Sequence, residues 1–262
     1  MALTQRSLFL YGLSVTEFNS SIDFKSSLGG PELQATLQVG HYSLSSLADE
    51  IVRAMTEVDP ITTNTYTVTI DRTLFGGTQN RVTIATSGSY LSLLFGSGTR
   101  SASTVAPLIG FTSTDYTGAT TYTGSVTAGT AMLPTFTGYN YLGPDYNHKV
   151  FGSVNVSSIG EKEAIVFNIQ RFIQVQFKYE TASKYVSEWL PFMDWAIQQR
   201  PFDFTPEVTS PNTFYSVTLE STAEDGKGLG MKFTEMLPQF PGLYDSGMMK
   251  FRVRIVSGLF VI

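Results

Sequence analysis

Alternation of apolar and polar side chains over residues 165–179 is the feature that most constrains how this chain can fold. Ile165, Phe167 and Ile169 recur at every second position, and the pattern continues from Ile173 to Tyr179. A period of two places these side chains on one face of a β-strand. Arg171-Phe172 interrupts the phase, which predicts either a bulge or a bend in one long strand.

The same period recurs along the rest of the chain, in short segments separated by glycine-rich turns. Such spacing is typical of antiparallel sheets. In the second half the predicted strands lie at 215–219, 231–233 and 251–255, with a glycine-rich hairpin loop at 224–230 between the first two. In the first half they lie at 9–15, 22–24, 33–39, 66–70 and 82–84, and Gly76-Gly77 marks a hairpin turn between the last two.

Two segments carry a helical pattern instead. Between 43 and 56 an apolar stripe runs along one helix face, Ser43 is placed to cap the start, and Pro60 lies beyond the end. The stripe comprises Leu44, Leu47, Ala48, Ile51, Val52 and Met55. A second helix is predicted at 187–199 with Pro191 in its first turn. A strand leading into an irregular turn is the alternative for that segment.

Together these patterns predict a mainly β protein of the α+β class with two parts. Residues 1–130 form a module of a small sheet and one amphipathic helix, and residues 145–262 form an antiparallel β-sandwich-like domain. Residues 112–139 are rich in Thr, Gly and Tyr and hold one charged side chain, Asp115. This segment is interpreted either as an arm that contacts a neighbouring chain or as a solvated linker.

Composition argues against most enzyme classes. The chain has no cysteine and two histidines, His41 and His148, so thiolate chemistry and histidine metal sites have little support. Lys227 lacks the following Ser or Thr of a phosphate-binding loop. A net charge of −5 gives no support for nucleic-acid binding. We expect a non-enzymatic protein without cofactor or metal, synthesised in the cytoplasm without a signal peptide or membrane span.

The candidates for an interface are aromatic side chains and one arginine. These residue types concentrate at the centres of protein–protein interfaces. For the cluster between 189 and 204 a core under the C-terminal sheet is the favoured interpretation, and sugar stacking is a weaker third one. The candidates are Trp189, Phe192, Trp195, Arg200, Phe202 and Phe204, together with Tyr116 and Tyr122 in the arm.

A set of motifs between 22 and 118 resembles a module of tailed-bacteriophage virion structural proteins, found in tail, baseplate and fibre-associated components. The motifs cover a little over a third of the chain. They are Ile22-Asp-Phe24, Gly40-His-Tyr-Ser-Leu-Ser-Ser-Leu-Ala-Asp-Glu-Ile51, Tyr66-Thr-Val-Thr-Ile-Asp-Arg72, Ser92-Leu-Leu-Phe-Gly-Ser-Gly98, Pro107-Leu-Ile-Gly-Phe111 and Asp115-Tyr-Thr-Gly118. Phe192-Met-Asp-Trp195 and Arg200-Pro-Phe-Asp-Phe204 look like the β-sandwich portion of such proteins.

The resemblance implies a virion protein, most simply a tail or baseplate ring or adaptor that binds other copies of itself and neighbouring tail proteins. The low charge density agrees, since the cores of lasting interfaces are depleted in charge. Two alternatives stay open: a tail protein that binds host glycans, and a head decoration or connector protein. The resemblance brings no catalytic residue to this chain.

Overall fold

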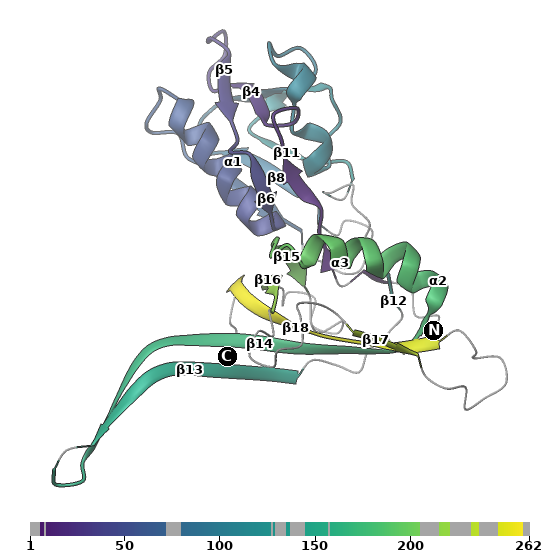
Figure 1. The fold of residues 1–262 in the computed structure, drawn as a ribbon. Coiled ribbons are helices and arrows are strands. Elements are labelled where there is room, and N and C mark those ends of the chain that lie inside the picture. The colour runs from purple at the N-terminus through teal and green to yellow at the C-terminus, as the bar shows by residue number, and fades with distance from the viewer. Residues whose placement is uncertain are drawn as a thin grey trace, which may run out of the picture.

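The protein is mainly β, and its strands pair antiparallel. The computed structural model describes residues 6–7, 9–71, 80–126, 128, 135–136, 145–156, 158–204, 215–220, 232–235 and 246–258. Figure 1 shows two β-rich parts, an N-terminal module and a C-terminal sheet, with a helical segment between them and a long hairpin that extends away from the sheet.

The N-terminal module contains two small sheets and a strand pair. The predicted strands at 22–24, 66–70 and 82–84 are present, and the pairing of the last two confirms the predicted hairpin. The strand predicted at 33–39 covers only Leu33–Thr36, and Val39 beyond it is exposed. The turn Gly76-Gly77 itself lies outside the described residues. The first sheet has the strand order β10 (Asp115–Ala119), β9 (Leu91–Leu94), β4 (Ser21–Lys25) and β5 (Leu33–Thr36). The second sheet has the strand order β11 (Thr121–Thr123), β8 (Val82–Thr86) and β7 (Tyr66–Ile70). The strand pair consists of β3 (Leu13–Val15) and β6 (Gly40–Tyr42).

Helix α1 (Leu44–Val58) confirms the helix expected from the apolar stripe. Ser43 caps its start, since the Ser43 hydroxyl accepts a hydrogen bond from the Ser46 N–H and the Ser46 hydroxyl accepts one from the Ser43 N–H. This reciprocal arrangement satisfies backbone donors that the first turn cannot pair. Leu47 and Ile51 have no exposed surface, and α1 packs against β5 and β7.

The segment expected to form an arm is largely part of this module. Strand β10 pairs with β9, and β11 pairs with β8, so residues 115–123 extend two sheets rather than leaving the body. The reason is that Tyr122 supplies a buried anchor, which the Thr- and Gly-rich composition obscured. Farther along, β12 (Thr135–Phe136) pairs with β1 (Arg6–Ser7), and the other residues of 129–144 lie outside the described ranges.

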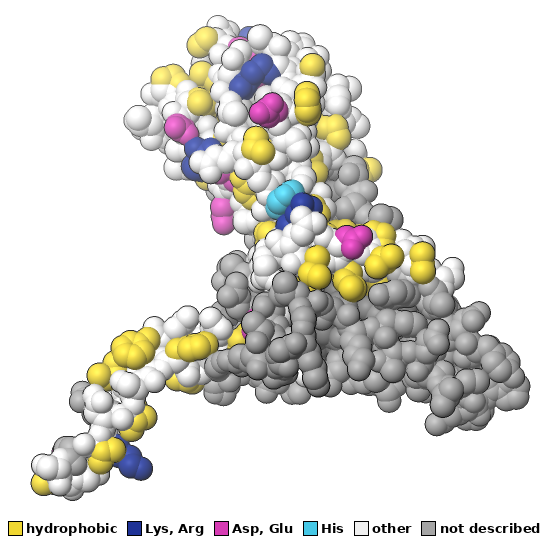
Figure 2. Space-filling view, in the orientation of Figure 1, with side chains coloured by type: hydrophobic (Ala, Val, Ile, Leu, Met, Phe, Trp, Pro, Cys, Tyr) yellow, Lys and Arg dark blue, Asp and Glu magenta, His cyan; other side chains and the backbone are white. Residues whose placement is uncertain are grey.

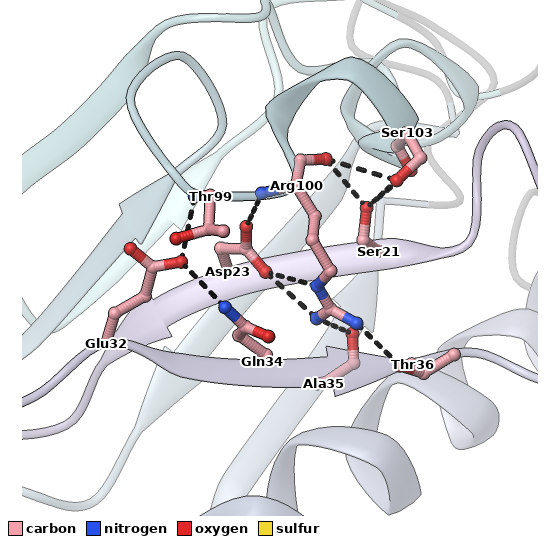
Figure 3. A network of polar contacts seen from close by, with 9 residues as sticks. All are labelled: Ser21, Asp23, Glu32, Gln34, Ala35, Thr36, Thr99, Arg100 and Ser103. Atoms are coloured by element: carbon pink, nitrogen blue, oxygen red, sulfur yellow. Dashed lines mark hydrogen bonds and ion pairs between the residues drawn. The ribbon is translucent and has the colours of Figure 1, made fainter.

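An ion pair fixes the short helical turns η1 (Ser101–Ser103) and η2 (Ala106–Ile109) to this module (Figure 3). The Arg100 guanidinium donates to Asp23 Oδ1 from Nε at 3.0 Å and from Nη2 at 2.9 Å. It also donates to the carbonyl of Ala35 and to the Thr36 hydroxyl on β5. A Cβ at Gly98 would lie 2.6 Å from Asp23 Cβ, so the approach of this loop requires glycine.

The strands of the second half join one sheet with seven members. The predicted strands at 165–179, 215–219 and 251–255 are present, and the described part of the one at 231–233 lies in a strand that begins at Lys232. Residue 231 and the loop 224–230 lie outside the described residues. The order is β13 (Asp145–Val156), β14 (Lys162–Thr181), β18 (Ser246–Gly258), β16 (Tyr215–Leu219), β15 (Phe202–Phe204) and β2 (Phe9–Leu10), and β17 (Lys232–Glu235) also pairs with β18.

The phase change at Arg171-Phe172 is not a bulge. The register of β13 with β14 runs through it without a shift. At Phe172 strand β14 gains β18 as a second neighbour, and Phe172 and Ile173 are both buried, so both faces are apolar there. The shift in register lies earlier in β14, where Phe151 pairs with Asn168 and Gly152 with Val166.

A helical segment packs on the C-terminal sheet, as the sequence predicts, but it begins earlier than residue 187. It consists of α2 (Ala182–Lys184), the π-helical turn η3 (Tyr185–Trp189) and α3 (Leu190–Ala196). Pro191 lies in the first turn of α3, but this turn follows the π-helical turn η3 directly, so the proline is inside a continuous helical run rather than at its start. Figure 1 places this segment between the N-terminal module and the sheet.

The predicted N-terminal strand at 9–15 is divided between the two parts. Gly12 has a positive φ of 82°, which breaks the strand into β2 and β3. Strand β2 pairs with β15 in the C-terminal sheet, whereas β3 pairs with β6 in the N-terminal module. The module therefore does not start at residue 1, because residues 9–10 belong to the other sheet.

Candidate assembly surface

Four of the predicted interface residues lie in the interior. Trp189, Phe192, Phe202 and Phe204 have no exposed surface. The Phe192 ring centroid lies 4.9 Å from that of Phe202 on β15 and 6.1 Å from that of Trp189. The favoured interpretation, a core between the helical segment and the sheet, is the one this burial supports. A partner cannot contact these rings while the fold is intact.

Tyr11 extends this core toward the N-terminal module. Its ring centroid lies 5.0 Å from that of Phe192 in an edge-on arrangement and 6.1 Å from that of Trp195. Burial raises the pKa of Tyr11 to about 12, and the nearby negative charge of Glu188 contributes to the rise. The phenol is therefore neutral throughout the physiological range, and its part in the core is structural.

Trp195 and Arg200 lie at the junction between the two parts. The Arg200 guanidinium carbon lies 4.9 Å from the centroid of the half-buried Trp195 ring, a cation–π distance. On another side of the indole, the ring of His41 on β6 lies 5.0 Å away, edge-on. The His41 Nδ1 lies 2.6 Å from the Ser14 hydroxyl on β3. These side chains join α3 to the β3–β6 pair of the module.

A buried carboxylate makes a second connection between the parts. Asp203 on β15 accepts a hydrogen bond at Oδ2 from the Leu44 backbone N–H, at 2.8 Å. Leu44 is the first residue of α1, where unpaired N–H groups and the helix dipole favour a negative charge. The N-terminus of α1 is thus satisfied from the C-terminal sheet as well as by Ser43.

The junction is expected to weaken in mild acid. Burial lowers the pKa of His41 below 6.5, and the positive charge of Arg200 lowers it further. As the pH falls, His41 therefore takes up a proton in the unfolded chain at a higher pH than in the folded protein. Its contribution to the free energy of unfolding is fully present above pH 6.5. It is lost as the pH falls from 6.5 toward the lowered pKa. Urea unfolding at pH 7 and pH 5 should show a larger loss for the wild type than for His41→Gln; equal losses would contradict this.

Tyr116 and Tyr122 belong to the core of the N-terminal module. Their ring centroids lie 5.8 Å apart, and the Tyr116 ring packs edge-on against Phe111 at 5.2 Å. The Tyr122 hydroxyl donates to a backbone carbonyl and accepts from the Ala119 N–H. Tyr122 is buried and Tyr116 is half-buried, so the pair stabilises the sheets rather than offering an open contact surface.

Asp115, the one charged side chain of the segment 112–139, binds backbone N–H groups. Asp115 accepts hydrogen bonds from the N–H groups of Gly96 and Ser97, at 2.8 and 2.9 Å. Burial raises the pKa of Asp115, but the hydrogen bonds from Ser97 and Gly96 outweigh it, so the pKa is lowered.

Within the described ranges no group of three His, Asp or Glu side chains could hold a metal ion. No helix described there is long and apolar enough to cross a membrane.

The most exposed apolar surface is one that the sequence did not single out, the hairpin formed by β13 and β14. Residues 162–171 of β14 precede its first pairing with β18 and pair with β13 alone among the described strands. This part, with its partner residues 148–156, extends away from the body (Figure 1). We call residues 148–171 the projecting hairpin. Figure 2 shows apolar side chains along its length.

One face of the projecting hairpin is an apolar ladder. Paired residues of neighbouring strands lie on the same face. Val150 pairs with Ile169, Gly152 with Val166 and Val154 with Ala164, and the face ends where Val156 pairs with Lys162. The exposed fractions reach 63% at Val154, 53% at Val166 and 51% at Ile169. We define the apolar ladder as Val150, Val154, Val156, Val166 and Ile169.

The signal for this surface is present in the sequence. Residues 164–169 read Ala-Ile-Val-Phe-Asn-Ile, so the strand is apolar at consecutive positions rather than at alternate ones alone. Phe167 is 71% exposed and Ile165 is 41% exposed, on a segment where neither face is covered. Alternation alone does not distinguish a strand that is covered by its own chain from one that is covered by a neighbour.

Comparison with known proteins adds no family to these observations: no protein-family model matches the chain, and no curated protein matches it significantly.

Proposed function

We propose that this protein is a structural component of a tailed-phage virion, a tail or baseplate ring or adaptor protein that oligomerises and links neighbouring tail parts. The observation that carries the proposal is the projecting hairpin. An exposed β-ribbon with an apolar face, and with edges that no described strand covers, is a liability in a solitary protein, and natural proteins cover such edges. In a permanent assembly, the neighbouring subunits can cover these edges and the apolar face.

The position of the phage-like motifs adds support. The motifs run through β4, the start of α1, β7, β9, η2 and β10, which share one folded core. The motifs therefore fall within one folded module, although its strands β3, β5, β8 and β11 carry none of them. The glycan-binding alternative loses support, because Trp189 is buried and the half-buried Trp195 ring is already in contact with Arg200 and His41.

Immunogold imaging of purified particles, with an antibody against the full chain, tests the proposal. We expect the chain to be present in particles by mass spectrometry and the label to lie at the tail or baseplate. Label at the head would favour the decoration or connector alternative. Absence of the chain from particles that contain all other virion proteins would contradict the proposal.

A further inference from the structure

The projecting hairpin lacks the features that normally protect an exposed β-ribbon. Residues 150–160 and 164–170 contain no Asp, Glu, Lys, Arg or Pro. Charged side chains and prolines are the usual means by which an edge strand resists pairing with another chain. An isolated pair of strands is also marginally stable in water without a covered face. The sequence of this hairpin therefore fits a ribbon that is covered in the working protein.

The size of the ladder face is that of an apolar patch that often has a function. At about 3.3 Å per residue and about 10 Å across two strands, the projecting part is about 30 Å long and offers about 300 Å² on that face. The largest apolar patch on a typical monomer is about 300–600 Å² and often marks an interaction site. The ladder face alone is less than half of the roughly 800 Å² that each partner buries in a standard interface, so pairing along a strand edge has to add to the contact.

The charges near the hairpin disfavour two other kinds of partner. Lys149, Lys162 and Arg171 are balanced within the hairpin by Glu161 and Glu163, which leaves a net charge of +1 with His148 neutral, and the whole chain carries −5, so the surface is not strongly positive. Nucleic acid and anionic lipid both require a positive surface. Among the described strands, β13 pairs with β14 alone and residues 162–171 of β14 pair with β13 alone, so each has an edge that no described strand covers. Another copy of the chain offers the same edges and the same apolar ladder.

We propose that the projecting hairpin binds a second copy of this chain, and that the apolar ladder is the face covered in the contact. This inference rests on the proposed function and deepens it, since it names the surface and the partner through which the protein self-associates. The partner copy replaces water over Val150, Val154 and their ladder neighbours, and its β-structure supplies hydrogen-bond partners to the open edge.

Two matched pairs of substitutions on β13 test this inference. Val150→Asp with Val154→Asp places two charges on the ladder, whereas Ser153→Asp with Asn155→Asp places two charges on the opposite face of the same strand. All four side chains are exposed, so we expect circular dichroism spectra and melting temperatures like those of the wild type. Sedimentation velocity over a concentration series should show self-association of the wild type. The ladder pair should weaken it by about 100-fold, as for a hot-spot loss, and the control pair by much less.

A wild-type chain that stays monomeric at every concentration would overturn the inference, and so would a ladder variant that associates as the wild type does. Flotation with phosphatidylcholine–phosphatidylglycerol vesicles serves as a further arm. Vesicle binding that the ladder substitutions abolish, without self-association, would assign the hairpin to a membrane and overturn the inference. Hairpin-dependent association of a chain that is absent from virions would leave the inference standing while the proposed function fails.

Discussion

Replacement of Arg100 by alanine is expected to destabilise the folded protein by about 3–5 kcal/mol, the range for removing one partner of a buried ion pair. The Asp23 side chain is 2% exposed and that of Arg100 is 26% exposed, so the substitution would leave the carboxyl group in a nearly dry environment without its cation. It would lose both guanidinium hydrogen bonds and retain the one from the Arg100 backbone N–H. The free energy of unfolding in urea measures the loss.

A surface ion pair provides the matched control. Glu57→Ala removes the contact between Glu57 and Arg53 on α1, where the side chains are 69% and 40% exposed. Such pairs contribute about 0–1 kcal/mol. In an Asp23→Asn background, Arg100→Ala should lower the free energy of unfolding by less than it does in the wild type, because no buried charge is then left unpaired. Equal losses for Arg100→Ala and Glu57→Ala would show that the network in Figure 3 does not hold the loop.

The same contacts explain how much of the fold the sequence could predict. Helix α1 and strand β14 were predictable, because a stripe with a cap and an alternating run are local patterns. The contact of Asp203 with Leu44 joins residues 159 positions apart, and that of Asp23 with Arg100 joins residues 77 apart. No local pattern specifies which distant backbone a carboxylate will meet.

The candidate site was missed for a related reason. Alternation assigns side chains to faces of a strand, but the neighbouring strands decide which face is covered. Phe172 and Ile173 are buried because β18 begins to pair there, whereas Val166 and Phe167, a few residues earlier, are exposed. Composition directed attention instead to tryptophan and arginine. Those residues became the core and the junction, since large aromatic rings also bury the most area in a fold.

A substitution at Phe192 tests whether the aromatic cluster is a core of the fold or a protein–protein interface. Phe192→Ala is expected to destabilise the protein by about 3–5 kcal/mol, the range for truncating a buried phenylalanine. Its ring contacts rings from three places in the chain: Trp189 in the helical segment, Phe202 on β15 and Tyr11 beside β2. The cavity would therefore loosen the helical segment, the sheet and the N-terminal connection together. Thermal and urea unfolding, followed by circular dichroism, measure the effect.

Leu190→Ala on the same helix is the control, because Leu190 is 36% exposed and its truncation should cost less than about 1 kcal/mol. Self-association adds a second readout. If Phe192 acts through the core, any fraction of Phe192→Ala that remains folded should still associate through its hairpin. A variant with wild-type stability that no longer associates would instead make the cluster an interface, and would require these rings to become exposed when copies meet.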